Sequence, residues 1–133
     1  MFVYFVRHGK TPLGEKGTYQ LGDTPLSERG REEAVLIAKR VSEIEFDALV
    51  SSTFLRAKET AAELQKYQKK AVYSETDLFV EIKRPSEVEG RSADDPEVKK
   101  IYKAVKENHL DPSWRYSDEE SFTMVLRSEE HHV

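Results

Sequence analysis

Apolar residues along this chain form short continuous runs in some places and recur at helical spacing in others. Residues 2–6 are continuously apolar and rich in β-branched and aromatic side chains, the pattern of a strand covered on both faces in a parallel sheet. From Ser27, a good helix N-cap, apolar residues recur with helical spacing as far as residue 44. Residues 46–51 repeat the strand pattern and residues 55–67 the helical one. This βαβα order predicts an α/β domain with a parallel sheet.

The second half of the chain has weaker secondary-structure patterns. Residues 71–73 and 78–82 could each contribute strand. Asp95 is predicted to cap a helix that has a proline in its first turn and apolar residues on one face. Residues 111–118 are predicted to be a loop, and a further helical pattern starts at Ser121. We find no internal repeat and predict one domain over residues 1–133.

Composition and charge narrow the class of protein. A chain of 133 residues with 38% hydrophobic and 35% charged residues suits one globular domain with a modest core. The 21 basic and 25 acidic residues are interspersed, which predicts neither nucleic-acid nor membrane partners. Cysteine is absent, which excludes disulfides, thiolate metal sites and cysteine nucleophiles. The sequence shows no signal-peptide pattern and no apolar stretch of about 20 residues, so we expect a cytoplasmic location.

The residues with phosphate chemistry follow the two predicted strands. Arg7, His8 and Gly9 come directly after the first strand, at the carboxyl end where open α/β sheets bind ligands. An arginine offers planar donors to phosphate oxygens, a neutral imidazole can attack phosphorus, and glycine lets the backbone approach a ligand. Arg56 follows the second strand and is predicted to lie at the same edge. An Arg-His-Gly triplet alone is a weak signal, because a histidine after a buried strand is ordinarily a capping or packing residue.

Three ordered blocks and a fourth, looser one make a more specific pattern. They are Arg7-His8-Gly9-Lys10-Thr11, Pro25-Leu26-Ser27-Glu28-Arg29-Gly30, Ser51-Ser52-Thr53-Phe54-Leu55-Arg56-Ala57-Lys58-Glu59-Thr60-Ala61, and Glu81-Ile82 with Glu89-Gly90. On these residues the chain resembles the histidine phosphatase superfamily, also called phosphoglycerate mutase-like, over residues 1–126. The resemblance implies a three-layer α/β/α sandwich with a mostly parallel sheet. Because the sequence shows no second His-Gly motif, we expect the fold to lack its C-terminal strand and helices.

The resemblance also implies a mechanism and a set of site residues. His8 would become a phosphohistidine, and Arg7, Gly9, Thr11 and Arg56 would bind the phosphate. Glu81 would protonate the leaving oxygen, with no metal and no cofactor. Residues 83–120 would form a lid, as in small-molecule phosphatases. The expected activity is hydrolysis of a small phosphomonoester by a histidine acid-type phosphatase, in preference to mutase activity.

Two alternatives stay open at this stage. The chain could bind phosphate without turnover, because the second active-site histidine of the family has no counterpart. It could instead self-associate through an exposed edge of an incomplete sheet. His131 and His132 lie at the terminus after a helical pattern, and we interpret them as a frayed tail rather than as a replacement. Glu81 has Glu87 and Glu89 nearby, so a simple solvated role is its alternative.

Overall fold

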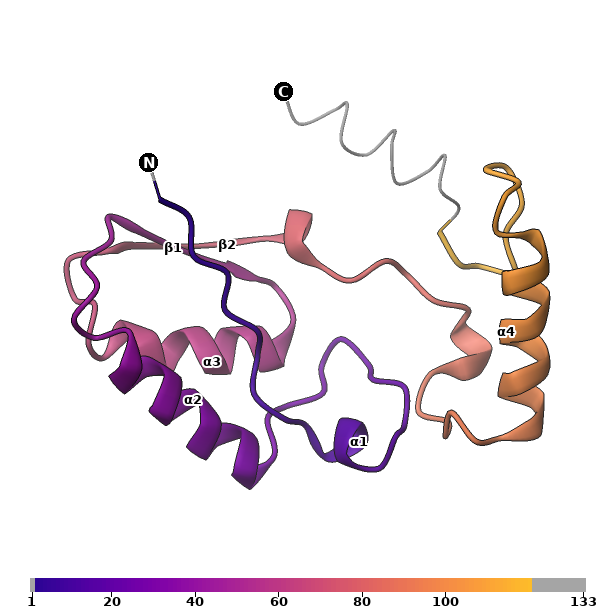
Figure 1. Cartoon of the computed structure of the whole chain (residues 1–133), viewed down its shortest axis with the longest axis horizontal. Coiled ribbons are helices and arrows are strands. Elements are labelled where there is room, and N and C mark those ends of the chain that lie inside the picture. Colours follow the sequence, from indigo (N-terminus) through magenta and orange to yellow (C-terminus); the bar gives the residue numbers. More distant parts are fainter. Residues whose placement is uncertain (1, 121–133) are drawn as a thin grey trace. The chain divides into compact units, whose positions relative to one another are not determined.

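The computed structural model describes residues 2–120, and the contacts within it divide the chain into two units (Figure 1). Unit 1 consists of residues 2–15 together with Leu21–Val80. Unit 2 consists of Lys16–Gln20 together with the chain from Glu81 onward. A short N-terminal segment therefore belongs to the second unit, and each unit is described by itself.

Unit 1 is a small α/β unit with a parallel sheet. Its elements are α1 (Pro12–Glu15), α2 (Glu28–Arg40), β1 (Ala48–Ser52), α3 (Leu55–Gln65), β2 (Val72–Thr76) and the 3-10 turn η1 (Asp77–Phe79). Strands β1 and β2 pair in parallel, with Ala48 opposite Val72 and Ser52 opposite Thr76. Figure 1 shows α2 and α3 on the same side of this sheet. The predicted α/β class with a parallel sheet is confirmed.

The local sequence explains why α2 and α3 form and pack. The Ser27 hydroxyl caps α2 by accepting the Gly30 N–H at 3.1 Å, and Lys39 and Arg40 lie in the last turn, where basic residues favour the helix dipole. Helices α2 and α3 are in contact, and their buried residues are mostly small. These are Gly30, Ala34 and Ala38 of α2, and Arg56, Thr60, Ala61 and Leu64 of α3. Small residues let the two backbones approach closely.

Two strand predictions are wrong. Residues 2–6 form no strand, and Phe2 and Phe5 are 88% and 90% exposed. An apolar run becomes a strand only when a neighbour pairs with its backbone, and β1 pairs with β2 in the part of the chain that the structure describes. Residues 78–82 are also not a strand. The Thr76 hydroxyl accepts the Leu78 N–H at 3.2 Å and starts the turn η1 there, so the strand ends at Thr76.

Unit 2 is built around α4 (Pro96–Asn108) and the 3-10 turn η2 (Ser86–Val88). Its core contains Val88, Val98 and Ile101, against which Tyr19 and other partly buried residues pack. Backbone hydrogen bonds join the segment Lys16–Gln20 to this unit, for example from the Tyr19 N–H to the Arg91 carbonyl at 3.0 Å. The N-terminal segment is therefore an integral part of unit 2.

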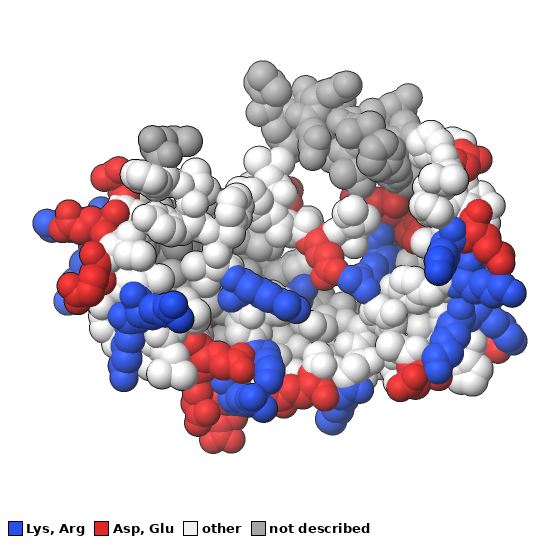
Figure 2. All heavy atoms as spheres, viewed as in Figure 1, with Lys and Arg blue, Asp and Glu red and all other residues white. Residues whose placement is uncertain are grey.

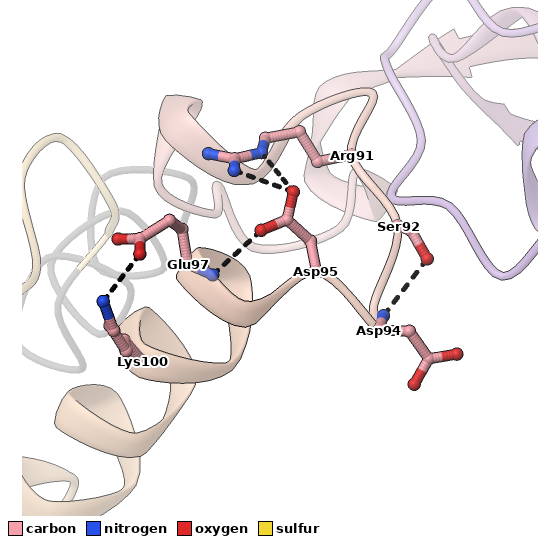
Figure 3. Close-up of polar contacts among 6 residues, drawn as sticks. All are labelled: Arg91, Ser92, Asp94, Asp95, Glu97 and Lys100. Carbon is pink, nitrogen blue, oxygen red and sulfur yellow. Dashed lines mark hydrogen bonds and ion pairs between the residues drawn. The ribbon is translucent and has the colours of Figure 1, made fainter.

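The predicted cap of α4 is confirmed (Figure 3). One oxygen of Asp95 accepts the Glu97 N–H at 2.8 Å, while the other accepts hydrogen bonds from Arg91 Nε at 3.1 Å and Nη2 at 2.8 Å. The pKa of Asp95 is lowered mainly by the Arg91 guanidinium and next by the Glu97 N–H. Residues 111–118 form no helix or strand, as predicted, whereas the helix expected from Ser121 lies outside the described residues. The role of residues 83–120 as a lid stays a prediction.

Candidate active site

The segment Arg7–Thr11, which we call the His8 loop, lies between the start of α2 and the helix α3. Its Lys10 carbonyl accepts the Ser27 N–H at 2.8 Å, which ties the loop to the N-cap of α2. The Gly9 N–H donates to the Thr60 hydroxyl at 3.3 Å, which ties the loop to α3. The loop is therefore held by α2 and α3.

Two glycines bring the loop and α2 into direct backbone contact. A Cβ atom on Gly9 would lie 2.2 Å from the Gly30 carbonyl oxygen, and one on Gly30 would lie 1.9 Å from the Lys10 carbonyl oxygen. Both clashes are with backbone, which has no flexible end that can move aside. Gly30 lies within the first turn of α2, where glycine costs about 1 kcal/mol relative to alanine. The sequence showed Gly30 only as part of a motif, and no pattern in it pointed to this contact.

Hydrogen bonds at both ring nitrogens orient His8. Its Nδ1 lies 2.7 Å from the Gly9 carbonyl oxygen, which can only accept a hydrogen bond, so Nδ1 must carry the proton. In the neutral ring, Nε2 then holds the lone pair. Nε2 accepts a hydrogen bond from Arg56 Nε at 3.3 Å. The geometry therefore directs the Nε2 lone pair to a guanidinium group.

Arg56 is a buried arginine whose position is fixed on several sides. It lies in the first turn of α3 and is only 4% exposed. Its Nη1 donates to the Leu21 carbonyl at 2.9 Å, and its guanidinium lies 4.6 Å from the centre of the Phe54 ring. The structure thus brings together Arg56 and His8, although His8 does not follow a strand as the sequence predicted. A cation held in this way is preorganised for an anion beside His8.

The other expected phosphate ligands are placed differently. Arg7 is exposed, and Thr11 is 1% exposed with its hydroxyl accepting the Gly14 N–H at 3.0 Å. A groove of about 310 Å³ adjoins the loop. It is lined by Arg7, His8, Gly9, Glu33, Ala34, Leu36, Ile37 and Thr60. Phosphate binding by Arg7, Gly9 and Thr11 stays a prediction.

Glu81, the expected general acid, belongs to unit 2, so its position relative to His8 is not determined. Within that unit its carboxylate forms an ion pair with Arg84. The Arg84 guanidinium in turn lies 5.1 Å from the centre of the Tyr19 ring and donates to the Tyr102 hydroxyl at 3.3 Å. Glu81 is therefore held on a defined cluster, and its catalytic role stays a prediction.

The described surface offers neither a metal site nor a membrane-spanning helix. Within residues 2–120, no group of three or more histidine, cysteine, aspartate or glutamate side chains is arranged to hold a metal ion. None of the described helices is long and apolar enough to cross a membrane. Basic and acidic side chains are interspersed over the face shown in Figure 2.

Comparisons with known proteins agree with this geometry. The model of the histidine phosphatase superfamily (branch 1) matches residues 3–128. The Schizosaccharomyces pombe protein named "Probable phosphatase C1687.21" is 32% identical over 110 residues, which are 82% of this chain and 51% of that protein. The Arabidopsis thaliana 2,3-bisphosphoglycerate-dependent phosphoglycerate mutase 1 is 40% identical over 60 residues, or 44% of this chain and 18% of that protein.

Solved structures share the fold. The alpha-ribazole phosphatase from Shigella flexneri has a TM-score of 0.75 at 23% identity, covering 95% of this chain and 62% of that one. The mycobacterial glucosyl-3-phosphoglycerate phosphatase has a TM-score of 0.70 at 26% identity, covering 93% and 58%. The chain spans about half the length of the S. pombe relative. The family match over nearly the whole sequence shows that this chain belongs to the histidine phosphatase superfamily, branch 1.

Proposed function

We propose that this chain carries the nucleophile of a phosphatase that hydrolyses a small phosphomonoester through a phosphohistidine on His8. The observation that carries the proposal is the His8 ring itself. Its Nδ1–H is directed to the Gly9 carbonyl, and its Nε2 faces the buried Arg56 guanidinium at 3.3 Å. A lone pair beside a fixed cation is the arrangement that phosphoryl transfer to a nitrogen requires.

The proposed reaction has two steps. In the first, the His8 Nε2 lone pair forms a bond to phosphorus, the bond from phosphorus to the leaving oxygen breaks, and Glu81 gives that oxygen a proton. In the second, water attacks phosphorus, the P–N bond breaks, and the water's proton passes to the Glu81 carboxylate. General acid–base catalysis of this kind contributes about 10² to 10⁴ in rate.

The arginines are proposed to stabilise the charge on the phosphoryl oxygens. When the phosphate arrives, the Arg56 Nε–H can leave the imidazole and bond to a phosphate oxygen, since both are acceptors. Arg7 is proposed to bind a second oxygen, together with the backbone at Gly9. The Thr11 hydroxyl can still donate to phosphate while it accepts the Gly14 N–H.

The choice of phosphatase over mutase rests on the longer match, because the S. pombe protein aligns over 110 residues and the Arabidopsis thaliana mutase over 60. The S. pombe relative and the mycobacterial structure are both named as phosphatases, and the latter acts on glucosyl-3-phosphoglycerate by its name. We propose a small phosphorylated metabolite as the substrate class, with residues 83–120 as the lid over it.

The second candidate function is phosphate binding without turnover. Within unit 1, His8 is the only described histidine and its Nε2 faces Arg56, whereas His109 belongs to unit 2, where its ring Nδ1 is 2.6 Å from the Lys106 carbonyl oxygen. The described part of unit 1 therefore offers one histidine for the reaction. Loss of one preorganised donor elsewhere typically costs about 10² to 10³ in rate, which makes this candidate distinct from the first.

The test is hydrolysis of a generic aryl phosphate by the purified chain without added metal. His8→Ala is the decisive variant, and His109→Ala is its matched control. Turnover in the wild type and in His109→Ala, with none in His8→Ala, is expected, together with an acid-labile phosphoryl group trapped on His8. A folded wild type that binds inorganic phosphate but neither turns over nor becomes labelled would establish the second candidate instead.

A further inference from the structure

One peptide group lies between the nucleophile and a carboxylate. The Gly9 carbonyl oxygen is 2.7 Å from His8 Nδ1, and the Lys10 N–H donates to Glu33 Oε2 at 3.0 Å. This carbonyl and this N–H belong to the same peptide unit. The three groups therefore form a continuous chain of hydrogen bonds that runs from Glu33 through the backbone to the imidazole ring.

Such a chain of hydrogen bonds transmits polarisation because the peptide unit is conjugated. An anion that accepts the N–H shifts electron density toward the carbonyl oxygen of the same unit, which makes that oxygen a stronger acceptor. The stronger acceptor favours the proton on His8 Nδ1 over the proton on Nε2. Glu33 would thus favour the tautomer whose Nε2 lone pair faces Arg56.

The structure holds the Glu33 carboxylate in place from several sides. The carboxylate forms ion pairs with Lys10 Nζ at 3.7 Å and with Arg29 Nε at 3.5 Å, one helical turn earlier. The rest of α2 is locked to the same loop through the Ser27 N–H and through the backbone contact at Gly30. Glu33 also lines the groove beside His8 and Gly9.

We infer that Glu33 is a positioning residue that acts through the Gly9–Lys10 peptide group to set the tautomer of His8. The inference rests on the proposed function of His8, which it deepens. Neither the sequence motifs nor the comparisons give Glu33 a role. An aspartate that holds a catalytic histidine in serine hydrolases does a similar task by direct contact.

The decisive variant is Glu33→Gln, because the amide oxygen can still accept the Lys10 N–H while the charge is lost. Its matched control is Glu32→Gln, which removes the same charge from an exposed position of the same helix. The ¹⁵N chemical shifts of the His8 ring report the tautomer directly in the folded chain, at a pH where the ring is neutral. Backbone amide spectra verify that each variant is folded.

The expected result follows from the strength of cooperative hydrogen bonding. A strengthening of roughly 10–30% in one hydrogen bond corresponds to a change of up to about twofold in the ratio of the Nδ1–H to the Nε2–H tautomer. We expect Glu33→Gln to lower the ratio by this factor and Glu33→Ala to lower it at least as much. Glu32→Gln should leave it unchanged.

Two results would overturn the inference. One is a wild-type ring that carries its proton on Nε2, and the other is a Glu33→Gln ring with the wild-type ratio. Neither measurement requires turnover, so failure of the inference is distinguishable from failure of the proposed function, which the aryl phosphate assay decides.

Discussion

The backbone contact between Gly30 and the His8 loop predicts that Gly30→Ala destabilises the protein, although alanine is the better helix former. The new Cβ would lie 1.9 Å from the Lys10 carbonyl oxygen. Ordinary contact needs about 3.5 Å, so the loop and α2 must separate by roughly 1.5 Å. That separation stretches the hydrogen bonds that join Lys10 to Ser27 and to Glu33.

The magnitude follows from three effects. Overpacking costs about 1–3 kcal/mol, and the two weakened hydrogen bonds cost about 0.5–1.5 kcal/mol each. The gain in helix propensity returns about 1 kcal/mol. We expect Gly30→Ala to lose about 3 kcal/mol of unfolding free energy. Any activity should fall further, since a displacement of about 1 Å at a reacting group can cost on the order of 10² in rate.

The assay is urea unfolding followed by circular dichroism, with Glu32→Ala on the exposed side of the same helix as the control for helix propensity. Gly9→Ala tests the other half of the contact, and it should be destabilising as well. The double variant should lose less than the sum of the two single losses, because both substitutions push apart the same pair of segments. A Gly30→Ala protein as stable as the wild type would refute the argument, since only helix propensity would then matter.

Three further predictions follow from other parts of the molecule. Thr60→Val should lower the free energy of unfolding by about 1–3 kcal/mol, because it leaves the buried Gly9 N–H without an acceptor. Thr60→Ser keeps the hydroxyl and should retain the stability in the same unfolding assay. Phe5→Lys should abolish any concentration-dependent self-association of the chain seen by gel filtration, because Phe5 is 90% exposed in an apolar segment. A wild type that elutes identically at all concentrations would refute self-association. The pKa of Asp118 is lowered to about 2, mainly by the hydrogen bond from the Ser86 N–H and next by the Lys83 ammonium. The stabilisation that the Asp118 carboxylate provides is therefore present above about pH 4 and is lost as the pH falls toward 2. Asp118→Asn should flatten that part of the profile of stability against pH, and an unchanged profile would contradict the assignment.

The sequence predicted those features that depend on local pattern. Ser27 caps α2 because its hydroxyl reaches the N–H three residues on, and this relation is visible in the sequence alone. Arg56 could be placed because a residue after a parallel strand must lie at the sheet edge. The family motifs then added roles for these positions that periodicity could not supply.

What the sequence did not predict depends on partners distant in the chain. Residues 2–6 have the composition of a buried strand, but composition does not say whether a neighbouring strand is present. The contact between Gly9 and Gly30 and the hydrogen bond from Lys10 to Glu33 each join residues about twenty positions apart. Both are set by how α2 packs against the loop, and no spacing rule encodes that packing.

The path of the chain between the two units means that no single cut separates them cleanly. The backbone enters unit 2 at Lys16, returns to unit 1 at Leu21 and enters unit 2 again at Glu81. Cleavage after Val80 would place Gly17 and Tyr19 on the first fragment and their backbone partners Ala93, Arg91 and Gly90 on the second. The Tyr19 ring, which stacks on Tyr102, would also lie on the first fragment. Because unit 2 needs both fragments, a protein cleaved at this junction should stay associated until it is denatured.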